Sequence, residues 1–379
     1  MCETSPHVGF EASARRRSRA HRWPGRLVCA LALPALAAGC GLDVFYALHA
    51  IGGQAGILFG AVPVEDAIAD SRTAMTTREG LESVVELREF ARDQIRLNVD
   101  TSFELFYDAG GAPVAFSVSA SRRDALEPIL WEFPFFGSVP FLNYFDRGSA
   151  ESKVGELEFW GMDAFMYELD AYSLAVLPNP ILSPMLDRDE IDLATLVFHE
   201  LTHRTVGRSD DGTDLDSRYN ESVATYVGRR AAEWYFESRD GAGSARAIEA
   251  AARYADDDIV TAFMQDLADR LDAMYASDIS ADQKLANKAT MFEEARSTFT
   301  NQIAPSLQYR ERYGLLHNMP ANNAFVLLYR RYNERQTLFD DVFEATNQQW
   351  GSTLRVYQEA AASPEDPFEY LELWLAARQ

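Results

Sequence analysis

Cysteine is nearly absent from this chain and is confined to its beginning. The 379 residues contain three cysteines, Cys2, Cys29 and Cys40, and none lies beyond residue 40. A chain that begins at Cys40 therefore has no second thiol for an internal disulfide and no other thiolate to bind a metal. The sequence excludes a scaffold stabilised by disulfides, and any metal site in it has to use histidines and carboxylates.

Basic residues are also scarce, with 35 Lys and Arg against 58 Asp and Glu and a formal net charge of −23. Contacts with phosphates need clustered Lys and Arg, so this balance argues against binding of nucleic acid or of an anionic membrane surface. The content of 47% hydrophobic and 12% aromatic residues is nevertheless that of a globular protein rather than a disordered one.

The apolar run Leu27–Ala38 is too short to span a bilayer, which takes about 20 residues. Six arginines precede it, and Ala37-Ala38-Gly39-Cys40 follows at its end. This order is typical of a signal peptide that is cleaved before a cysteine that receives lipid. We therefore expect residues 1–39 to be a lipoprotein signal peptide, and the protein to be a lipid-anchored protein of the bacterial cell envelope that faces the periplasm. The pattern does not decide between the inner and the outer membrane.

The pattern along the remaining chain predicts an α+β protein in which helices predominate. Residues 64–72 and 78–98 are expected to be helices, and the β-prone stretches 102–107 and 114–119 flank Asp108-Ala-Gly-Gly111 as in a hairpin. The aromatic stretch 131–145 reads as strand and loop. Further helices are expected at 219–238, 244–275, 281–304, 321–334, 336–348 and 352–361. We expect one domain, 40–379, with a smaller β-containing part at about 40–186 and a helical part at about 187–379.

The residues that indicate chemistry are His199-Glu200-Leu201-Thr202-His203. Histidines at positions i and i+4 lie on one face of a helix, so both imidazoles can bind the same ion. Acidic residues before the motif favour a helix start, and Ala194, Val197, Phe198 and Leu201 form an apolar stripe. The motif predicts one Zn²⁺ per chain. Glu200 is placed to take a proton from a water molecule on the metal.

A catalytic zinc needs a third protein ligand and one open position. Glu221, which begins the next predicted helix, is the expected third ligand, and Glu233 and Glu237 on that helix are the weaker alternatives. The spacing resembles that of the gluzincin metallopeptidases. Asn220 and Thr225 are placed to hydrogen-bond the ligands.

A donor to the oxyanion of the transition state is commonly a tyrosine or a histidine. The sequence offers Tyr309, Tyr313 and His317 for this role and does not select among them.

The chain from Phe133 to Gly228 resembles the putative aminopeptidase lipoprotein family of Gram-negative bacteria, which are predicted zinc peptidases. The matching residues are Gly137-Ser-Val-Pro-Phe141, Tyr144-Phe145, Gly161-Met-Asp163, Ala171-Tyr172-Ser173, Pro180, Leu182-Ser183, Leu196–His203, Asn220–Thr225 and later Asn322-Asn323-Ala324. The resemblance implies a zincin-like fold, a gluzincin-like zinc site and peptide hydrolysis. The chain has Thr202 where the family often has alanine, and this change does not affect the ligands.

We therefore expect a zinc metallopeptidase of the HExxH…E type, an aminopeptidase by the family's description, that acts through a metal-bound water activated by Glu200. Its partners would be a peptide substrate and a membrane, reached through lipid on Cys40. A different class remains open: an envelope lipoprotein whose zinc site is structural or inactive and which acts as a binding or assembly factor. Such a protein would not need Glu200. The sequence decides neither exo- against endopeptidase action nor the oligomeric state.

Overall fold

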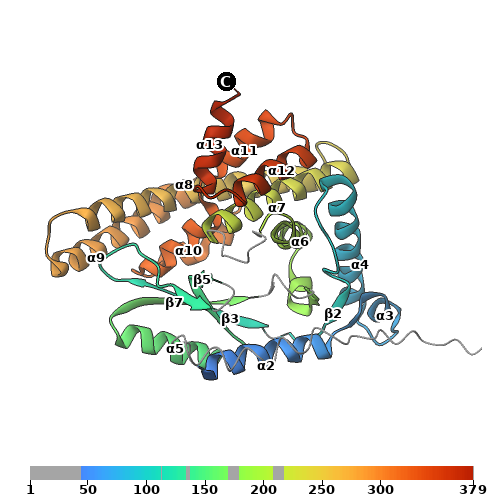
Figure 1. The fold of residues 1–379 in the computed structure, drawn as a ribbon, viewed down its shortest axis with the longest axis horizontal. Coiled ribbons are helices and arrows are strands. Elements are labelled where there is room, and N and C mark those ends of the chain that lie inside the picture. The colour runs from blue at the N-terminus through green and yellow to red at the C-terminus, as the bar shows by residue number, and fades with distance from the viewer. Residues whose placement is uncertain (1–43, 112, 134–136, 170–178, 208–216, 379) are drawn as a thin grey trace, which may run out of the picture.

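The computed structural model describes residues 44–111, 113–133, 137–169, 179–207 and 217–378, and most of these residues lie in helices (Figure 1). The α-helices are α2 (Val44–Gly60), α3 (Val64–Ala69), α4 (Met75–Phe90), α5 (Arg147–Phe159), α6 (Glu190–Thr205), α7 (Ser217–Asp240), α8 (Ala245–Ala276), α9 (Ala281–Thr298), α10 (Asn323–Asn333), α11 (Gln336–Ala345), α12 (Trp350–Ala361) and α13 (Pro367–Ala376). The strands are β1 (Val62–Pro63), β2 (Leu105–Tyr107), β3 (Ala115–Arg122), β4 (Trp131–Phe133), β5 (Gly137–Val139), β6 (Phe141–Tyr144), β7 (Met162–Leu169) and β8 (Ile181–Leu182).

The largest sheet has the order β6-β3-β7 and is antiparallel throughout. Strand β3 is buried along nearly its whole length because α5 and α10 both pack against it, α5 below the sheet and α10 above it in Figure 1. A second, smaller sheet joins β1, β2 and β8, and β4 pairs with β5 in a separate hairpin. In Figure 1 the strands lie below the helices of the second half of the chain.

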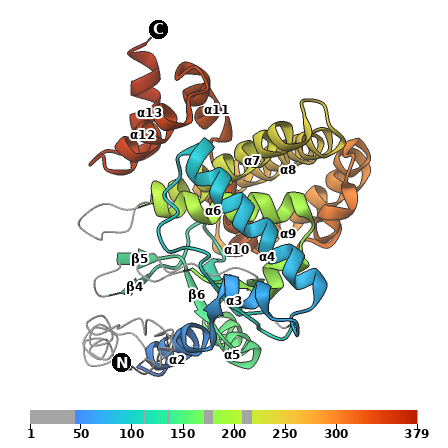
Figure 2. The ribbon, with the colours of Figure 1, turned by 90° about the vertical axis from the view of Figure 1, so that its right-hand side faces the viewer.

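Two of these helices, α6 and α7, form an antiparallel pair in the main hydrophobic core. A side chain at Gly228 on α7 would meet the backbone oxygen of Thr195, whereas one at Gly207, just after α6, would meet Asn220 at the start of α7. The start of α7 thus lies beside the end of α6. Helix α4 packs against α6 on one side, α8 and α10 pack against α7, and α11 to α13 cover the other end of the core (Figure 2).

The structure confirms the expected predominance of helices and most of their positions. The expected hairpin of 102–107 with 114–119 is wrong: β2 pairs with β1 and β8, whereas β3 pairs with β6 and β7. Gly110 and Gly111 do adopt positive φ angles in a turn, but this turn lies between strands of two different sheets. The sequence patterns did not predict helices α2, α5 and α13.

The expected signal peptide and Cys40 lie outside the described residues. Among the helices that the structure describes, none combines the length and the apolar character needed to span a membrane.

Candidate metal centre

Helix α6 carries the two histidines, and its start is fixed by a side-chain cap. Asp189 precedes the helix and accepts hydrogen bonds from the backbone N–H groups of Ile191 and Asp192. This cap satisfies donors that have no partner within the helix, and its negative charge suits the positive end of the helix dipole. The expected apolar stripe is buried, and Thr202 is buried with its hydroxyl donating to the carbonyl of Phe198. The helix is therefore anchored at one end and packed along one side.

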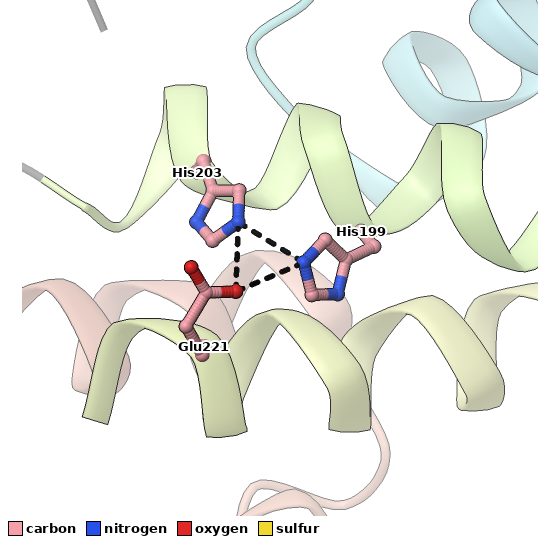
Figure 3. A group of neighbouring side chains, drawn as sticks. All are labelled: His199, His203 and Glu221. Carbon is pink, nitrogen blue, oxygen red and sulfur yellow. Dashed lines mark hydrogen bonds and ion pairs between the residues drawn. The ribbon is translucent and has the colours of Figure 1, made fainter. Parts of the chain in front are cut away.

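His199 and His203 on α6 and Glu221 on α7 converge on one point (Figure 3). The Nε2 atoms of the two histidines are 3.0 Å apart, and Glu221 Oε2 is 3.2 Å from His199 Nε2 and 3.4 Å from His203 Nε2. The three side chains are 14–15% exposed. They are thus mostly enclosed by protein but remain accessible from solvent. The structure brings together the three residues that the sequence predicted as ligands.

The donor set fits Zn²⁺. Two imidazole nitrogens and one carboxylate oxygen are ligands that zinc accepts in catalytic sites. Ligand atoms at the corners of a tetrahedron around zinc lie about 3.3 Å apart, for metal–ligand distances of about 2.0–2.1 Å. The three distances observed here lie close to that value. Among the described residues, this is the one group of three His, Cys, Asp or Glu side chains arranged to hold a metal ion.

Asn220 orients His203 toward this point. The side-chain oxygen of Asn220 lies 3.1 Å from His203 Nδ1. An amide oxygen only accepts hydrogen bonds, so Nδ1 carries the proton, and the lone pair of neutral His203 is on Nε2, which faces the other ligands. Thr225, the second residue expected to support the ligands, makes no hydrogen bond to them among the described residues.

The electrostatics of the site favour a cation. Burial by itself would lower the pKa of His203, but the charge of Glu221 and a hydrogen bond to it raise that pKa to about 9. Burial would raise the pKa of the Glu221 carboxyl, but the two histidines outweigh this effect and hold that pKa far below its usual range. In the absence of a metal the site therefore holds a proton in place of the cation.

Glu200, between the two histidines in sequence, has a buried carboxylate oxygen, Oε2, without a hydrogen-bond partner. Its negative charge contributes to the raised pKa of His203, so the carboxylate lies close to the ligand group. An unpaired carboxylate oxygen is unfavourable when buried and is expected where a ligand or substrate completes its contacts.

A tyrosine that the sequence analysis missed lies against the first ligand. The ring of Tyr332, near the end of α10, stacks on His199 with the ring centroids 6.1 Å apart. Burial and then the charge of Glu221 raise the pKa of Tyr332 well above its usual value, so the phenol keeps its proton. Its hydroxyl has no hydrogen-bond partner among the described residues. No local pattern marks Tyr332, because its place depends on how α10 packs against α6 and α7.

The three expected donors have other partners. Tyr313 donates to Asp257, His317 lies within hydrogen-bond distance of Thr300 and against the ring of Phe299, and Tyr309 lies beneath the guanidinium of Arg253. Among the contacts of described residues, none joins these three side chains to the metal ligands.

The two helices that carry the expected ligands, α6 and α7, approach so closely that a glycine is needed at their contact. A Cβ atom at Gly228 would lie 2.8 Å from the Thr195 oxygen and 3.3 Å from the Cβ of His199. Only glycine permits this contact without a shift of the helices. The distance between α6 and α7 in turn sets how far Glu221 reaches toward the histidines.

The fold is mainly helical, and a pair of antiparallel helices brings together two histidines and one glutamate that could hold a metal ion. A family model described as "Putative aminopeptidase" matches residues 45–368, which is most of the chain. The chain therefore belongs to this family. No curated protein and no solved structure matches the chain.

Proposed function

We propose that the protein is a zinc-dependent peptidase whose metal is held by His199, His203 and Glu221. The description of its family supports peptide hydrolysis, with removal of N-terminal residues as the mode that this description suggests. The observation that carries the proposal is the unpaired, buried carboxylate oxygen of Glu200 beside the three ligands. A purely structural zinc site would have no use for this carboxylate.

Glu200 is the general base in this proposal. It takes a proton from the attacking water and returns it to the amine that leaves when the peptide bond breaks. Zinc, when bound, would supply a Lewis acid that lowers the pKa of water and polarises the scissile carbonyl.

Tyr332 is the proposed donor to the oxyanion. Its phenol is protonated, has no other hydrogen-bond partner among the described residues and lies beside a ligand. A donor that is already in place when negative charge develops lowers the barrier without reorganisation.

We also propose that the protein is exported and anchored by lipid on Cys40, which the order of basic, apolar and small residues before Cys40 supports. Mass spectrometry of the protein purified from a membrane fraction tests this: an acylated peptide starting at Cys40 is expected. An unmodified N-terminus upstream would contradict it.

The proposed activity is tested on a mixed pool of peptides incubated with the zinc-loaded protein and, separately, with Glu200→Gln. We expect mass spectrometry to show new peptide ends with the unaltered protein only, while both proteins contain one zinc. The positions of the new ends separate trimming of N-termini from internal cleavage. Equal cleavage by the variant would refute the role of Glu200. Absence of cleavage by both, with zinc bound, would favour the binding or assembly factor.

A further inference from the structure

Three cationic side chains are buried in the described part of the chain: Arg253, Lys288 and Arg331. Arg253 binds the carboxylates of Asp189 and Glu249, and Lys288 binds that of Asp163. Arg331, which is 3% exposed and the most buried of the three, has no carboxylate partner among the described residues. A buried charge without a counter-ion is strongly unfavourable, and this chain has a large excess of acidic residues that could have supplied one.

The few contacts of Arg331 leave part of its guanidinium unused. Its Nη2 lies 3.5 Å from the carbonyl oxygen of Pro140, at the limit of a hydrogen bond, and the guanidinium lies over the ring of Phe141. Its Nη1 is buried and has no hydrogen-bond partner. A buried donor of this kind requires an explanation, and a ligand that completes its contacts is one.

The position of Arg331 connects it with the metal centre. It directly precedes Tyr332, whose ring stacks on His199, and its own carbonyl accepts a hydrogen bond from Ser222, the neighbour of Glu221. Its side chain reaches from α10 to Pro140 and Phe141 at the start of β6. The guanidinium therefore lies between α10 and the start of β6, on the residue next to the tyrosine that stacks on His199.

We propose that Arg331 binds a carboxylate of the substrate, and that the substrates are short peptides whose C-terminal carboxylate lies close to the scissile bond. This proposal rests on the proposed peptidase function. A planar guanidinium presents parallel N–H groups that match the two oxygens of a carboxylate. An extended peptide advances about 3.3–3.6 Å per residue, so only a residue near the scissile bond can place its carboxylate beside Tyr332 and Arg331. An acidic side chain at such a position offers the same chemistry.

Binding is measured in zinc-loaded Glu200→Gln, so that it does not depend on turnover. Isothermal titration calorimetry compares trialanine, its C-terminal amide and an amidated tripeptide that contains one glutamate. We expect trialanine to bind at least tenfold more tightly than its amide. In Glu200→Gln with Arg331→Gln, the acid and the amide should bind with equal affinity. If the glutamate peptide binds more tightly than the amide of trialanine, the substrate carboxylate that Arg331 binds can belong to an acidic side chain.

Arg330→Gln is the matched control, because Arg330 is the neighbouring residue on α10 and pairs with Asp272. It should keep the full preference for the acid. Arg331→Lys retains a charge without the paired N–H groups and should keep a reduced preference, which provides a test should Arg331→Gln fail to fold.

The proposal is overturned if Glu200→Gln binds all three peptides equally, or if the preference for the acid survives Arg331→Gln. Failure of the peptidase function gives a different result. In that case Glu200→Gln still binds trialanine more tightly than its amide, and this preference still depends on Arg331. The zinc-loaded protein with Glu200 intact, however, cleaves neither peptide.

Discussion

At the scale of single residues, Tyr332 differs from the other tyrosines considered as donors in what its hydroxyl contacts. Tyr313 already donates to Asp257, whereas the hydroxyl of Tyr332 is free among the described residues and its ring lies on His199. A donor used only in the transition state affects the chemical step rather than substrate binding.

Tyr332→Phe is therefore expected to lower kcat by about 10²–10³, with zinc content and KM little changed. Steady-state kinetics on a cleaved peptide give kcat and KM, and metal analysis gives the zinc content. Tyr329→Phe, on the same helix but packed against Phe325, is the control and should retain its kcat. Equal rates for Tyr332→Phe and the unaltered protein would remove Tyr332 from the mechanism.

Asn220 and Thr225 were equivalent in the sequence, but only Asn220 contacts a ligand in the structure. Residues that hydrogen-bond a ligating histidine typically strengthen metal binding by 10–100-fold, so we expect a loss of zinc affinity of about that size in Asn220→Ala. Competition for zinc with a chelator measures this loss. Thr225→Ala should bind zinc as the unaltered protein does. Weaker zinc binding by Thr225→Ala than by Asn220→Ala would show that Asn220 does not orient His203.

At the scale of elements, the site depends on the distance between α6 and α7. The pair is held close by Gly228, whose missing side chain leaves room for the backbone of Thr195 and for His199. Two packed helices cannot absorb an added methyl group at such a contact without moving apart or shifting along each other.

Gly228→Ala is therefore expected to lower the free energy of unfolding by about 1–3 kcal/mol and to weaken zinc binding. Thermal unfolding and chelator competition measure the two effects. Gly155→Ala, in α5, is the control because no atom lies within 4 Å of the added Cβ. Alanine there should leave stability unchanged or raise it by up to about 1 kcal/mol, through its better helix propensity. Tight zinc binding by Gly228→Ala would contradict the link between helix spacing and metal binding.

At the scale of the whole molecule, a buried polar network joins the β layer to the helices. Asp163 on β7 accepts hydrogen bonds from Lys288 on α9 and from the backbone N–H of Asn323 at the start of α10. The side-chain amide of Asn323 in turn donates to the carbonyl of Arg122 on β3. Two of the motifs that carried the family resemblance, around Asp163 and around Asn323, thus meet in space and position α10, the helix that carries Tyr332.

Lys288→Met leaves the buried carboxylate of Asp163 without its main counter-charge and is expected to destabilise the protein by about 3–5 kcal/mol. Denaturant-induced unfolding measures this change. Lys284→Met, one turn earlier on α9 and only partly buried, should change the stability by less than about 0.5 kcal/mol. Equal stability of the two variants would show that the network does not hold the layers together.

Periodic patterns predicted the long helices well, because each buries a continuous apolar stripe that repeats along the sequence. The wrong hairpin shows the limit of such reasoning: β2 and β3 are neighbours in sequence, but β2 pairs with β8, far along the chain. The proximity of His199, His203 and Glu221 was predictable because one helix turn and the following helix bring them together locally. Tyr332, Arg331 and the contact at Gly228 depend on how distant helices pack, which no local pattern encodes. The zincin-like fold expected from the resemblance stays a prediction.

A zinc titration tests whether zinc held by His199, His203 and Glu221 is required for peptide hydrolysis. Metal-free protein is given increasing amounts of zinc, and the rate of peptide cleavage is followed. We expect activity to rise in proportion to zinc and to stop rising at one zinc per chain, and His203→Ala to show no such rise. One bound zinc per chain without cleavage, or cleavage that does not depend on zinc, would contradict this expectation.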